Sequence, residues 1–375
     1  MRELDGSVRV TEVSDFESVR KEWNQVLEEN RFGNNVFLTL DWLSTWWKHF
    51  GGQRKLLLLK VEENNRVLGI APMMLSKYKL PAFGSIRKIE FLGTRHSDYN
   101  NFIICKKERA VVRSIIDYLN GVEDWDWIEL KEIPESTSYS RRLFADPSLK
   151  LEMKERVCNL CPYVELPKKF ESLKKTFRRN LRQNLNRYLR KIQTGHTLDL
   201  KRFDEAGFSA KEAMDLFIRL HEAKWGSQGK PGAFAEDTFR DFHMDVAESF
   251  AQNRWLGIYF LMVDGEPVAS QYTFEYYQKM YYYLAGFLPK YSSFSVGNLM
   301  IMFLLRECIE KGFTEYDMTR GLEPYKLQWT NKYRKNFEVR LVHKKITSEL
   351  YDWVTWGETV ENFATKIGLS LKTIR

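Results

Sequence analysis

The spacing of apolar and polar residues along the first half of the chain predicts alternating helices and strands. Apolar residues recur every three or four positions in segments of helical length, and shorter apolar runs are bounded by turn residues. The runs 56–61 and 67–75, joined by the turn Glu63-Asn64-Asn65, predict an antiparallel hairpin. The other elements expected here are helices at 16–27, 42–49 and 109–119 and strands at 8–10, 89–92, 101–104 and 125–130.

The second half of the chain continues this alternation. Apolar side chains recur along one face of a strongly basic segment, 168–191, which predicts an amphipathic helix that ends at Gly195. Two further helices are expected at 209–225 and 235–252, separated by a glycine-rich loop. They are followed by three runs with alternating aromatic residues, which predict an antiparallel meander of strands at 256–263, 267–275 and 279–287.

Residues 289–329 contain the feature around which the rest of the chain is arranged. A small, polar turn with Ser295 and Gly297 leads into a strongly apolar helix, and Gly312 ends that helix before a strand at 313–318. The first N–H groups of a helix have no partners within it, and the helix dipole favours an anion there. The turn therefore predicts a phosphate site, although a serine N-cap without any ligand gives the same pattern.

The two halves of the chain are similar in the order of their elements. Each has helices, a strand, a tight polar turn and a second strand, so we expect a topological repeat. The expected fold class is α/β (α+β), with two domains that each hold a mixed, largely antiparallel sheet flanked by helices. The expected boundaries are 1–165 for the first domain, 166–195 for a basic linking helix and 196–375 for the second domain.

Composition identifies a globular protein whose positive charge is local. Hydrophobic residues at 43% and aromatic residues at 14% are sufficient for buried cores. The net charge is +8, and the segment 168–191 holds ten Lys/Arg against one acid, Glu171, so the rest of the chain is close to neutral. Phosphate-rich partners would relieve the repulsion within this segment, and a solvated helix is the alternative. The candidate partners are a CoA tail, a lipid-linked sugar, an anionic membrane surface and tRNA.

Cysteine content and the chain's start favour a reducing, cytoplasmic setting, with a peripheral position at the inner face of the membrane left open. Four cysteines do not form a disulfide framework. Cys158 and Cys161 have C-x-x-C spacing, but no second pair completes a metal site, so we expect a structural role and no metal. The N-terminus lacks a signal-peptide pattern, and the apolar run 294–309 is too short to span a bilayer comfortably.

Short motifs spread over most of the chain are similar to those of a known protein family. They are Trp42 with Trp46-Trp47, Leu68-Gly69-Ile70-Ala71-Pro72, Phe91-Leu92-Gly93 with Asp98-Tyr99, Cys161-Pro162-Tyr163, Arg178-Arg179-Asn180-Leu181-Arg182, Asp264-Gly265 with Pro267-Val268-Ala269, Tyr291 through Ser295 with Gly297, Asp317, Gly321, and Tyr325-Lys326. In this order the chain resembles the CelD/BcsL-type acyltransferases of the GNAT (general N-acetyltransferase) superfamily. Its duplicated domain is similar to that of the Fem-type aminoacyltransferases. The resemblance implies two GNAT-like domains.

The resemblance also implies where an acyl donor lies. In the superfamily, the strand before the phosphate-holding helix splays from its neighbour and admits the pantetheine arm of acyl-CoA, and the helix start binds the pyrophosphate. The corresponding positions here are 281–287, with Tyr283, and the turn Ser295, Val296, Gly297 and Asn298. This turn is poorer in glycine than the usual acetyltransferase pattern, so aminoacyl-tRNA, the donor of Fem-type relatives, stays open.

Three candidate catalytic residues come from the resemblance. Tyr325 and Lys326 match a pair near the family's active cleft, where Fem-type enzymes use a lysine to stabilise developing charge. Asp98 matches an acid of the first domain that helps to orient the acceptor.

Two further candidates come from the residues themselves. Asp317 ends a strand beside the expected cleft and is a candidate general base, with a loop cap or a pair with Arg320 as the alternative. His221 is a candidate base because the ordinary histidine pKa lies near neutrality. It has no second histidine four residues on to complete a zinc motif, and a packed or surface histidine is the alternative.

These features predict an N- or O-acyltransferase. It would move an acyl group from acyl-CoA, such as acetyl-CoA, to an amine or hydroxyl of a small-molecule or lipid-linked sugar or another cell-envelope or exopolysaccharide precursor. One alternative is a Fem-type transferase that uses aminoacyl-tRNA. The other is a non-catalytic GNAT-fold binding protein in an envelope polysaccharide system.

Overall fold

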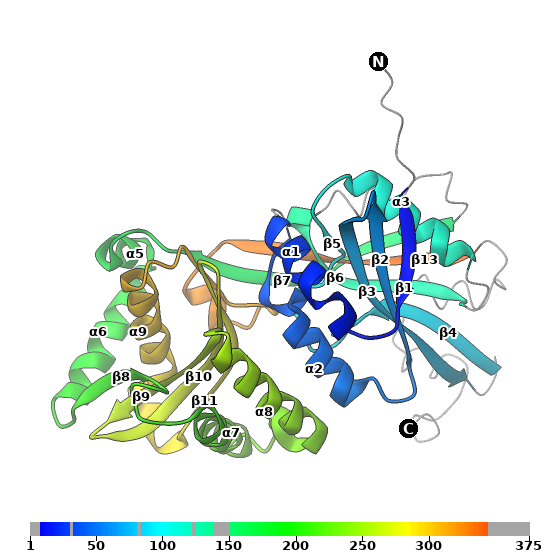
Figure 1. Cartoon of the computed structure of the whole chain (residues 1–375). Coiled ribbons are helices and arrows are strands. Elements are labelled where there is room, and N and C mark those ends of the chain that lie inside the picture. The colour runs from blue at the N-terminus through cyan, green and yellow to red at the C-terminus, as the bar shows by residue number, and fades with distance from the viewer. Residues whose placement is uncertain (1–7, 31–32, 81–83, 122–124, 138–150, 344–375) are drawn as a thin grey trace, which may run out of the picture. The chain divides into compact units, whose positions relative to one another are not determined.

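A computed structural model describes residues 8–30, 33–80, 84–121, 125–137 and 151–343 of the chain (Figure 1). The chain divides into two compact units. Unit 1 takes in residues 1–43, 51–158 and 336–375, and unit 2 takes in residues 44–50 and 159–335. This division differs from the expected domain boundaries, because β13 (Tyr333–His343) pairs with β6 (Trp127–Pro134) of unit 1. The basic segment belongs to unit 2 and does not stand apart as a linker.

Unit 1 is built on a mixed, mostly antiparallel sheet with the strand order β1-β2-β3-β4-β6-β13. The pair β4–β6 is parallel, and β5 pairs with β3. Apolar side chains of the strands and of α3 form its core, including Val111, Ile115 and Leu341. The remaining elements that lie wholly or partly in unit 1 are β1 (Arg9–Val13), α1 (Arg20–Glu29), α2 (Leu40–Phe50), β2 (Lys55–Glu63), β3 (Arg66–Leu80), β4 (Gly84–Phe91), β5 (Ile103–Ile104), α3 (Glu108–Gly121) and β7 (Leu151–Glu165).

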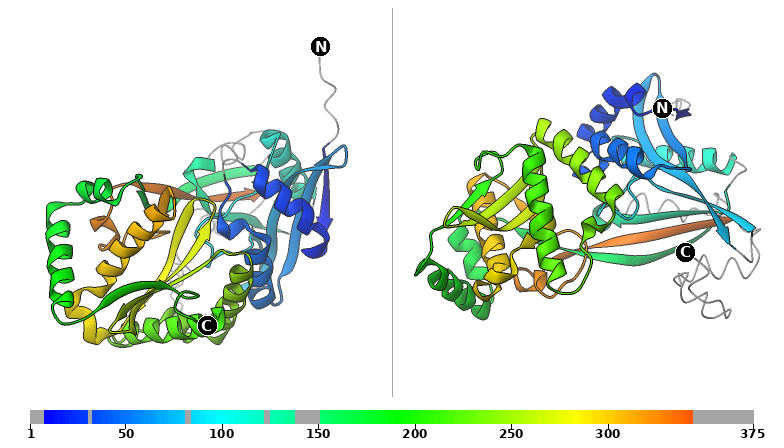
Figure 2. Two further views of the ribbon diagram at one scale, coloured as in Figure 1. Left: turned by 60° about the vertical axis from the view of Figure 1, so that its left-hand side comes forward. Right: turned by 90° about the horizontal axis from the view of Figure 1, so that it is seen from below.

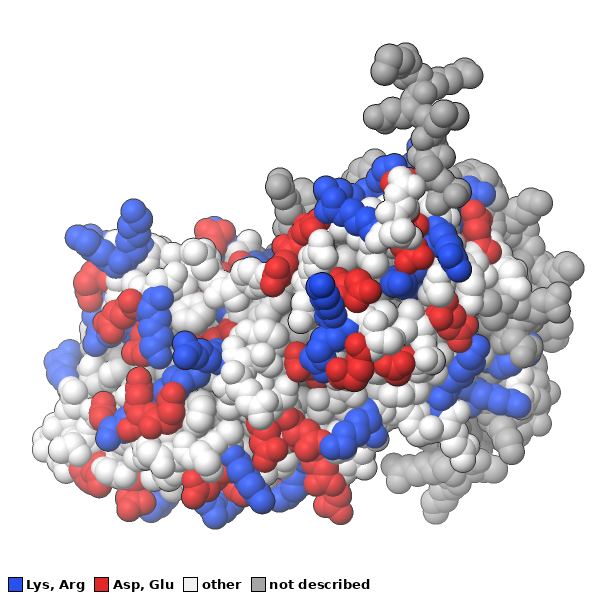
Figure 3. Space-filling view, in the orientation of Figure 1, with Lys and Arg blue, Asp and Glu red and all other residues white. Residues whose placement is uncertain are grey.

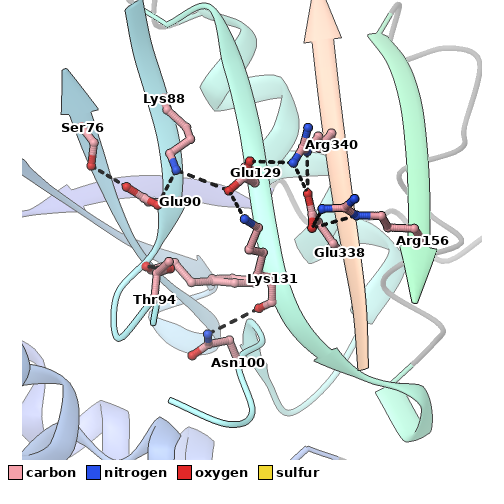
Figure 4. A network of polar contacts seen from close by, with 11 residues as sticks. Ser76, Lys88, Glu90, Thr94, Asn100, Glu129, Lys131, Arg156, Glu338 and Arg340 are labelled. Atoms are coloured by element: carbon pink, nitrogen blue, oxygen red, sulfur yellow. Dashed lines mark hydrogen bonds and ion pairs between the residues drawn. The ribbon is translucent and has the colours of Figure 1, made fainter. Parts of the chain in front are cut away.

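A row of charged side chains crosses neighbouring strands of unit 1 (Figure 4). At its centre, the Glu129 carboxylate lies 3.3 Å from Lys88 Nζ, 2.8 Å from Lys131 Nζ and 3.3 Å from Arg340 Nη2. Burial alone would raise the pKa of Glu129, but these three cations outweigh it and lower that pKa to about 2. Opposite charges face each other on neighbouring strands, so these ion pairs form in only one register of the sheet.

In unit 2 the sheet has the strand order β7-β12-β11-β10-β9-β8, in which β11–β12 is the parallel pair. α5, α6 and α9 pack with one face of this sheet in a shared apolar core, and α7 lies on the other face (Figure 2). The elements of unit 2 are α5 (Phe170–Thr176), α6 (Arg179–Gln193), β8 (Leu198–Arg202), α7 (Ala210–Gly226), α8 (Asp237–Gln252), β9 (Leu256–Val263), β10 (Glu266–Tyr276), β11 (Lys279–Phe287), α9 (Val296–Glu310) and β12 (Glu315–Asp317).

The basic segment forms two helices and not the single helix that periodicity predicted. Phe177 and Arg178 have extended ψ values of 143° and 144°, which separate α5 from α6. Apolar residues still face inward, and among the described residues no ion pair involves any of the ten cations between 168 and 191. Figure 3 shows Lys and Arg side chains that project from the α5 end of unit 2.

The structure confirms the fold class and the main elements predicted from periodicity. The hairpin β2–β3 and the meander β9–β10–β11 form as antiparallel pairs. The apolar helix begins at Val296, directly after the small, polar turn. None of the helices within the described ranges is long and apolar enough to cross a bilayer.

Candidate functional site

The start of α9 presents backbone N–H groups that no side chain of the described residues caps. A 3₁₀ turn, η6 (Pro289–Phe294), leads into Ser295, which takes a left-handed conformation with φ 52°. The Ser295 carbonyl accepts the N–H groups of Asn298 and Leu299, and its hydroxyl oxygen accepts a hydrogen bond from Asn298 Nδ2. The N–H groups that precede these remain available, so the helix start is suited to an anion.

This helix start lines a cavity of about 290 Å³, which we call the donor cavity. The size lies near the lower end of the range for small-molecule sites. Five of the residues predicted from sequence line it together: Ser295, Val296, Gly297, Asn298 and Tyr325. Its other walls come from α7, β10, η6, β11 and α9, through Lys224, Gln228, Ala269, Ser270, Gln271, Tyr282, Ala285, Gly286, Phe287, Ser292, Met300 and Ile301.

The course of β11 opens the sheet beside this cavity. β11 pairs with β12 from Lys279 to Tyr281, and its later residues extend past the end of β12. Its pairing with β10 also shifts by one residue, because Tyr272 pairs with Leu284 while Thr273 pairs with Tyr282. Tyr283 is the extra residue of this bulge, and bulges of this kind bend a strand. The part of β11 beside this cavity therefore runs past the end of β12 while it stays paired with β10.

Lys224 is the only Lys, Arg, His, Asp or Glu in the lining of the donor cavity. Burial lowers the pKa of its ammonium group, partly opposed by the charge of Glu323. Its Nζ lies 5.1 Å from the ring centre of Trp225 and 5.7 Å from that of Phe287. No carboxylate within the described residues forms an ion pair with it, so the cavity holds one uncompensated cation.

Lys224 was not among the site residues predicted from the sequence, although a signal was present. It lies three positions after His221 on α7, and residues at this spacing share one face of a helix. Its location beside β11 depends on the close approach of α7 to Gly286, which the sequence does not reveal.

Two phenols meet at the same cavity. The Tyr325 hydroxyl donates to the Tyr282 hydroxyl at 3.2 Å. Burial raises the pKa of Tyr282 to about 12, although the hydrogen bond from Tyr325 opposes this, and burial also raises the pKa of Tyr325. Both hydroxyls therefore keep their protons at neutral pH and can act as hydrogen-bond donors.

His221 supports the wall of the cavity from α7. Its Nδ1–H donates to the Ala285 carbonyl at 3.0 Å, and the Ala233 N–H donates to its Nε2 at 3.2 Å, which fixes the neutral tautomer. Burial lowers its pKa to about 4. Because backbone groups occupy both ring nitrogens, His221 positions β11 and is not among the lining residues.

Two other predicted residues of unit 2 lie near the cavity but do not line it. Lys326 is 3% exposed, and its Nζ donates to the Arg320 carbonyl at 2.7 Å and lies 3.0 Å from a carboxylate oxygen of Glu323. Asp317 is buried, with one carboxylate oxygen accepting from the Thr319 N–H at 2.8 Å. Its other oxygen accepts from Arg334 Nη1 at 2.9 Å. Both side chains hold the loop that carries Tyr325.

The last two predicted residues lie elsewhere. Tyr283 packs its ring against His243, Tyr272 and Phe274, while its neighbour Tyr282 lines the cavity. Asp98 is buried in unit 1, where its carbonyl accepts from Asn336 Nδ2 at 2.7 Å.

The described residues contain no cluster of His, Cys, Asp or Glu that could hold a metal ion. Cys158 and Cys161 are free thiols, and burial raises the pKa of Cys158 to about 11. A thiol with a raised pKa is a poor nucleophile and metal ligand.

Comparison with known proteins places this site in a known kind of domain. Residues 179–327, which include the donor cavity, match the family model of the acetyltransferase (GNAT) domain. A search of curated protein sequences gives no match.

Among solved structures, FemX is similar over 92% of this chain and 98% of its own, with 10% identity and a TM-score of 0.62. A conserved protein of unknown function from Bacteroides thetaiotaomicron is similar over 89% of this chain and 100% of its own, with 12% identity and a TM-score of 0.55. L-PGS from Bacillus licheniformis is similar over 88% of this chain and 94% of its own, with 13% identity and a TM-score of 0.52. The chain therefore shares its fold with these structures, and residues 179–327 match the GNAT domain.

Proposed function

We propose that this protein is an acyltransferase that moves an acyl group from acyl-CoA to an amine or hydroxyl of a sugar or another cell-envelope precursor. One observation carries the proposal: the uncapped start of α9 and the half-buried Lys224 line the same cavity, and no carboxylate does. Free N–H donors and a cation in a cavity whose lining contains no carboxylate favour an anionic ligand. The phosphates of CoA have this chemistry.

The donor would lie along β11. Its pyrophosphate would accept hydrogen bonds from the first-turn N–H groups of Val296 and Gly297, because the N–H groups of Ser295 and Asn298 already bond to backbone carbonyls. Its pantetheine arm would follow the part of β11 that extends past β12, where a strand edge offers backbone groups to an extended ligand. The thioester would then lie near Tyr282 and Tyr325.

Transfer would proceed by attack of the acceptor on the thioester carbonyl carbon. A new C–N or C–O bond forms, the C–S bond breaks, and the sulfur leaves with the electron pair of that bond. The proton lost by the acceptor would reach the sulfur through the Tyr325–Tyr282 pair, because both phenols stay protonated and can donate. Lys224 would stabilise negative charge on the donor.

The other predicted residues would act by positioning. Lys326 holds the loop that carries Tyr325 through the Arg320 carbonyl, in place of the direct contact with developing charge that the resemblance implied. We also propose that Asp98 orients the acceptor and that the chain belongs to the narrower CelD/BcsL-type group.

Titration calorimetry with acetyl-CoA and longer acyl-CoAs tests the donor site. A Cβ at Gly297 would meet no atom closer than Phe287 Cδ1 at 4.0 Å, so the position accepts a side chain. Gly297→Asp places a negative charge at the helix start and should weaken acetyl-CoA binding at least about tenfold. Gly297→Asn has the same shape without the charge and is the matched control. Equal affinity of the two variants would refute the phosphate site at α9.

A second candidate donor is aminoacyl-tRNA, favoured by the cations of α5 and α6 that lack ion pairs among the described residues. Charged tRNA would raise the midpoint of thermal unfolding, and its binding would weaken steeply with salt. Binding of tRNA without binding of acyl-CoA would replace the first proposal. Binding of neither would favour a non-catalytic protein.

A further inference from the structure

A second cavity, of about 440 Å³, shares no lining residue with the donor cavity. We call it the α5–α6 cavity. It is bounded by the end of β7, by the junction of α5 and α6, and by the chain from η7 (Lys326–Gln328) to β13. Its lining residues include Leu166, Leu173, Arg178, Leu327 and Trp329.

The indole N–H of Trp329 lacks an acceptor in this cavity wall. Trp329 is 3% exposed and packs edge-on against Phe177, with 5.3 Å between the ring centres. Its Nε1 is buried and finds no hydrogen-bond acceptor among the described residues. A buried donor without a partner is costly, so this atom points to a ligand that brings an acceptor.

The charges around the cavity favour an acceptor that is negative. Arg178, at the N-cap of α6, lines the cavity and is exposed, and no side chain of the described residues caps the helix start. The first turn of α6 contains no acid. The one acid of the lining, Glu165, lies 2.6 Å from Lys332 Nζ and is neutralised by it.

We propose that the α5–α6 cavity binds an amphipathic oxyanion, meaning a phosphate or carboxylate carried on an apolar group. The oxyanion accepts from Trp329 Nε1 and the first N–H groups of α6 and pairs with Arg178. The apolar group lies against Leu166, Leu173 and Leu327. A cavity of this volume is larger than a free phosphate needs, which is why the ligand has an organic part.

The test follows the Trp329 indole by NMR of protein labelled with ¹⁵N-tryptophan. The chain has 11 tryptophans, and the indole signal missing from Trp329→Phe identifies Trp329. Phenyl phosphate should shift this signal in the unchanged protein. Arg178→Gln should weaken binding about tenfold, the effect of losing one hydrogen bond to a charged group. Arg187→Gln removes one exposed arginine of α6 outside the lining and is the matched control.

The outcomes separate the possible sources of the oxyanion. Benzoate tests a carboxylate, and inorganic phosphate tests whether the apolar group contributes. An unmoved Trp329 signal with all three compounds overturns the proposal. Equal weakening by Arg178→Gln and Arg187→Gln also overturns it, because only general surface charge would then matter. The readout requires no transfer reaction and is independent of the donor proposal.

Discussion

The Tyr325 hydroxyl donates a hydrogen bond to the Tyr282 hydroxyl across 3.2 Å, joining the loop before η7 to β11. Both groups line the donor cavity. Because burial raises the pKa of Tyr282 to about 12, its hydroxyl stays protonated at neutral pH and can donate a hydrogen bond. This hydrogen bond forms only when β11 and the loop after β12 have the backbone conformations seen in the structure.

Tyr325→Phe removes the hydroxyl and keeps the ring. If the pair passes a proton to the leaving sulfur, we expect kcat to fall about 100-fold, with KM for acetyl-CoA nearly unchanged. Steady-state kinetics with acetyl-CoA measures this. Tyr277→Phe, at a tyrosine that is 63% exposed, is the control. An unchanged kcat in Tyr325→Phe would rule out the relay.

Gly286→Ala tests the close contact between β11 and α7. A Cβ at this position would lie 2.3 Å from the backbone N of His221 and 2.5 Å from the carbonyl carbon of Leu220. Backbone cannot move aside as a side chain can, so we expect a loss of about 3 kcal/mol in the free energy of unfolding. Urea unfolding measures it. Gly297→Ala, whose Cβ would meet only Phe287 Cδ1 at 4.0 Å, should differ from the unchanged protein by less than about 1 kcal/mol.

His221 makes stability depend on pH. Its pKa is about 4 in the folded protein and 6.5 in the unfolded chain, so below pH 6.5 the unfolded chain binds the extra proton. The stabilisation is complete above pH 6.5 and is lost as the pH falls towards 4, by up to about 3 kcal/mol. Urea unfolding at several pH values measures it, and His221→Gln should lack this component. An imidazole NMR titration with a midpoint near 6.5 would contradict the assignment.

Glu129→Gln tests the charge row of unit 1. The substitution leaves three cations without their shared carboxylate, so we expect a loss of about 3 kcal/mol in the free energy of unfolding at neutral pH. The folded pKa of about 2 lies below the ordinary value of 4.5, so the contribution of Glu129 is full above pH 4.5 and fades as the pH falls towards 2. Glu28→Gln, at an exposed position, should change little. Equal urea midpoints for the two variants would show that the row does not stabilise unit 1.

Periodicity predicted the elements that carry the donor cavity. The meander and the apolar helix follow from local patterns of apolar residues, and β11 has the bounds expected for it. The start of α9 beside Ser295 was predictable because it depends only on where the apolar run begins. The residues that match the GNAT domain, 179–327, include this helix start.

Features that depend on irregular pairing were not predictable. Strict alternation along β11 would put Tyr283 on the same face as Ala285 and Phe287. The bulge inserts one residue, so Tyr282 shares that face instead. The place of Lys224 was not predictable either, because it depends on how closely α7 approaches Gly286.

Residues at the two ends of the turn η7 line two different cavities. Tyr325, directly before it, lines one cavity, and Leu327, Gln328 and Trp329 line the other. A ligand that moves this turn when it binds in one cavity would change the free energy of binding in the other cavity. Thermodynamic linkage makes that effect mutual, so each ligand would alter the affinity of the other by the same factor. The donor cavity and the α5–α6 cavity would then respond to each other's occupancy through a turn of three residues.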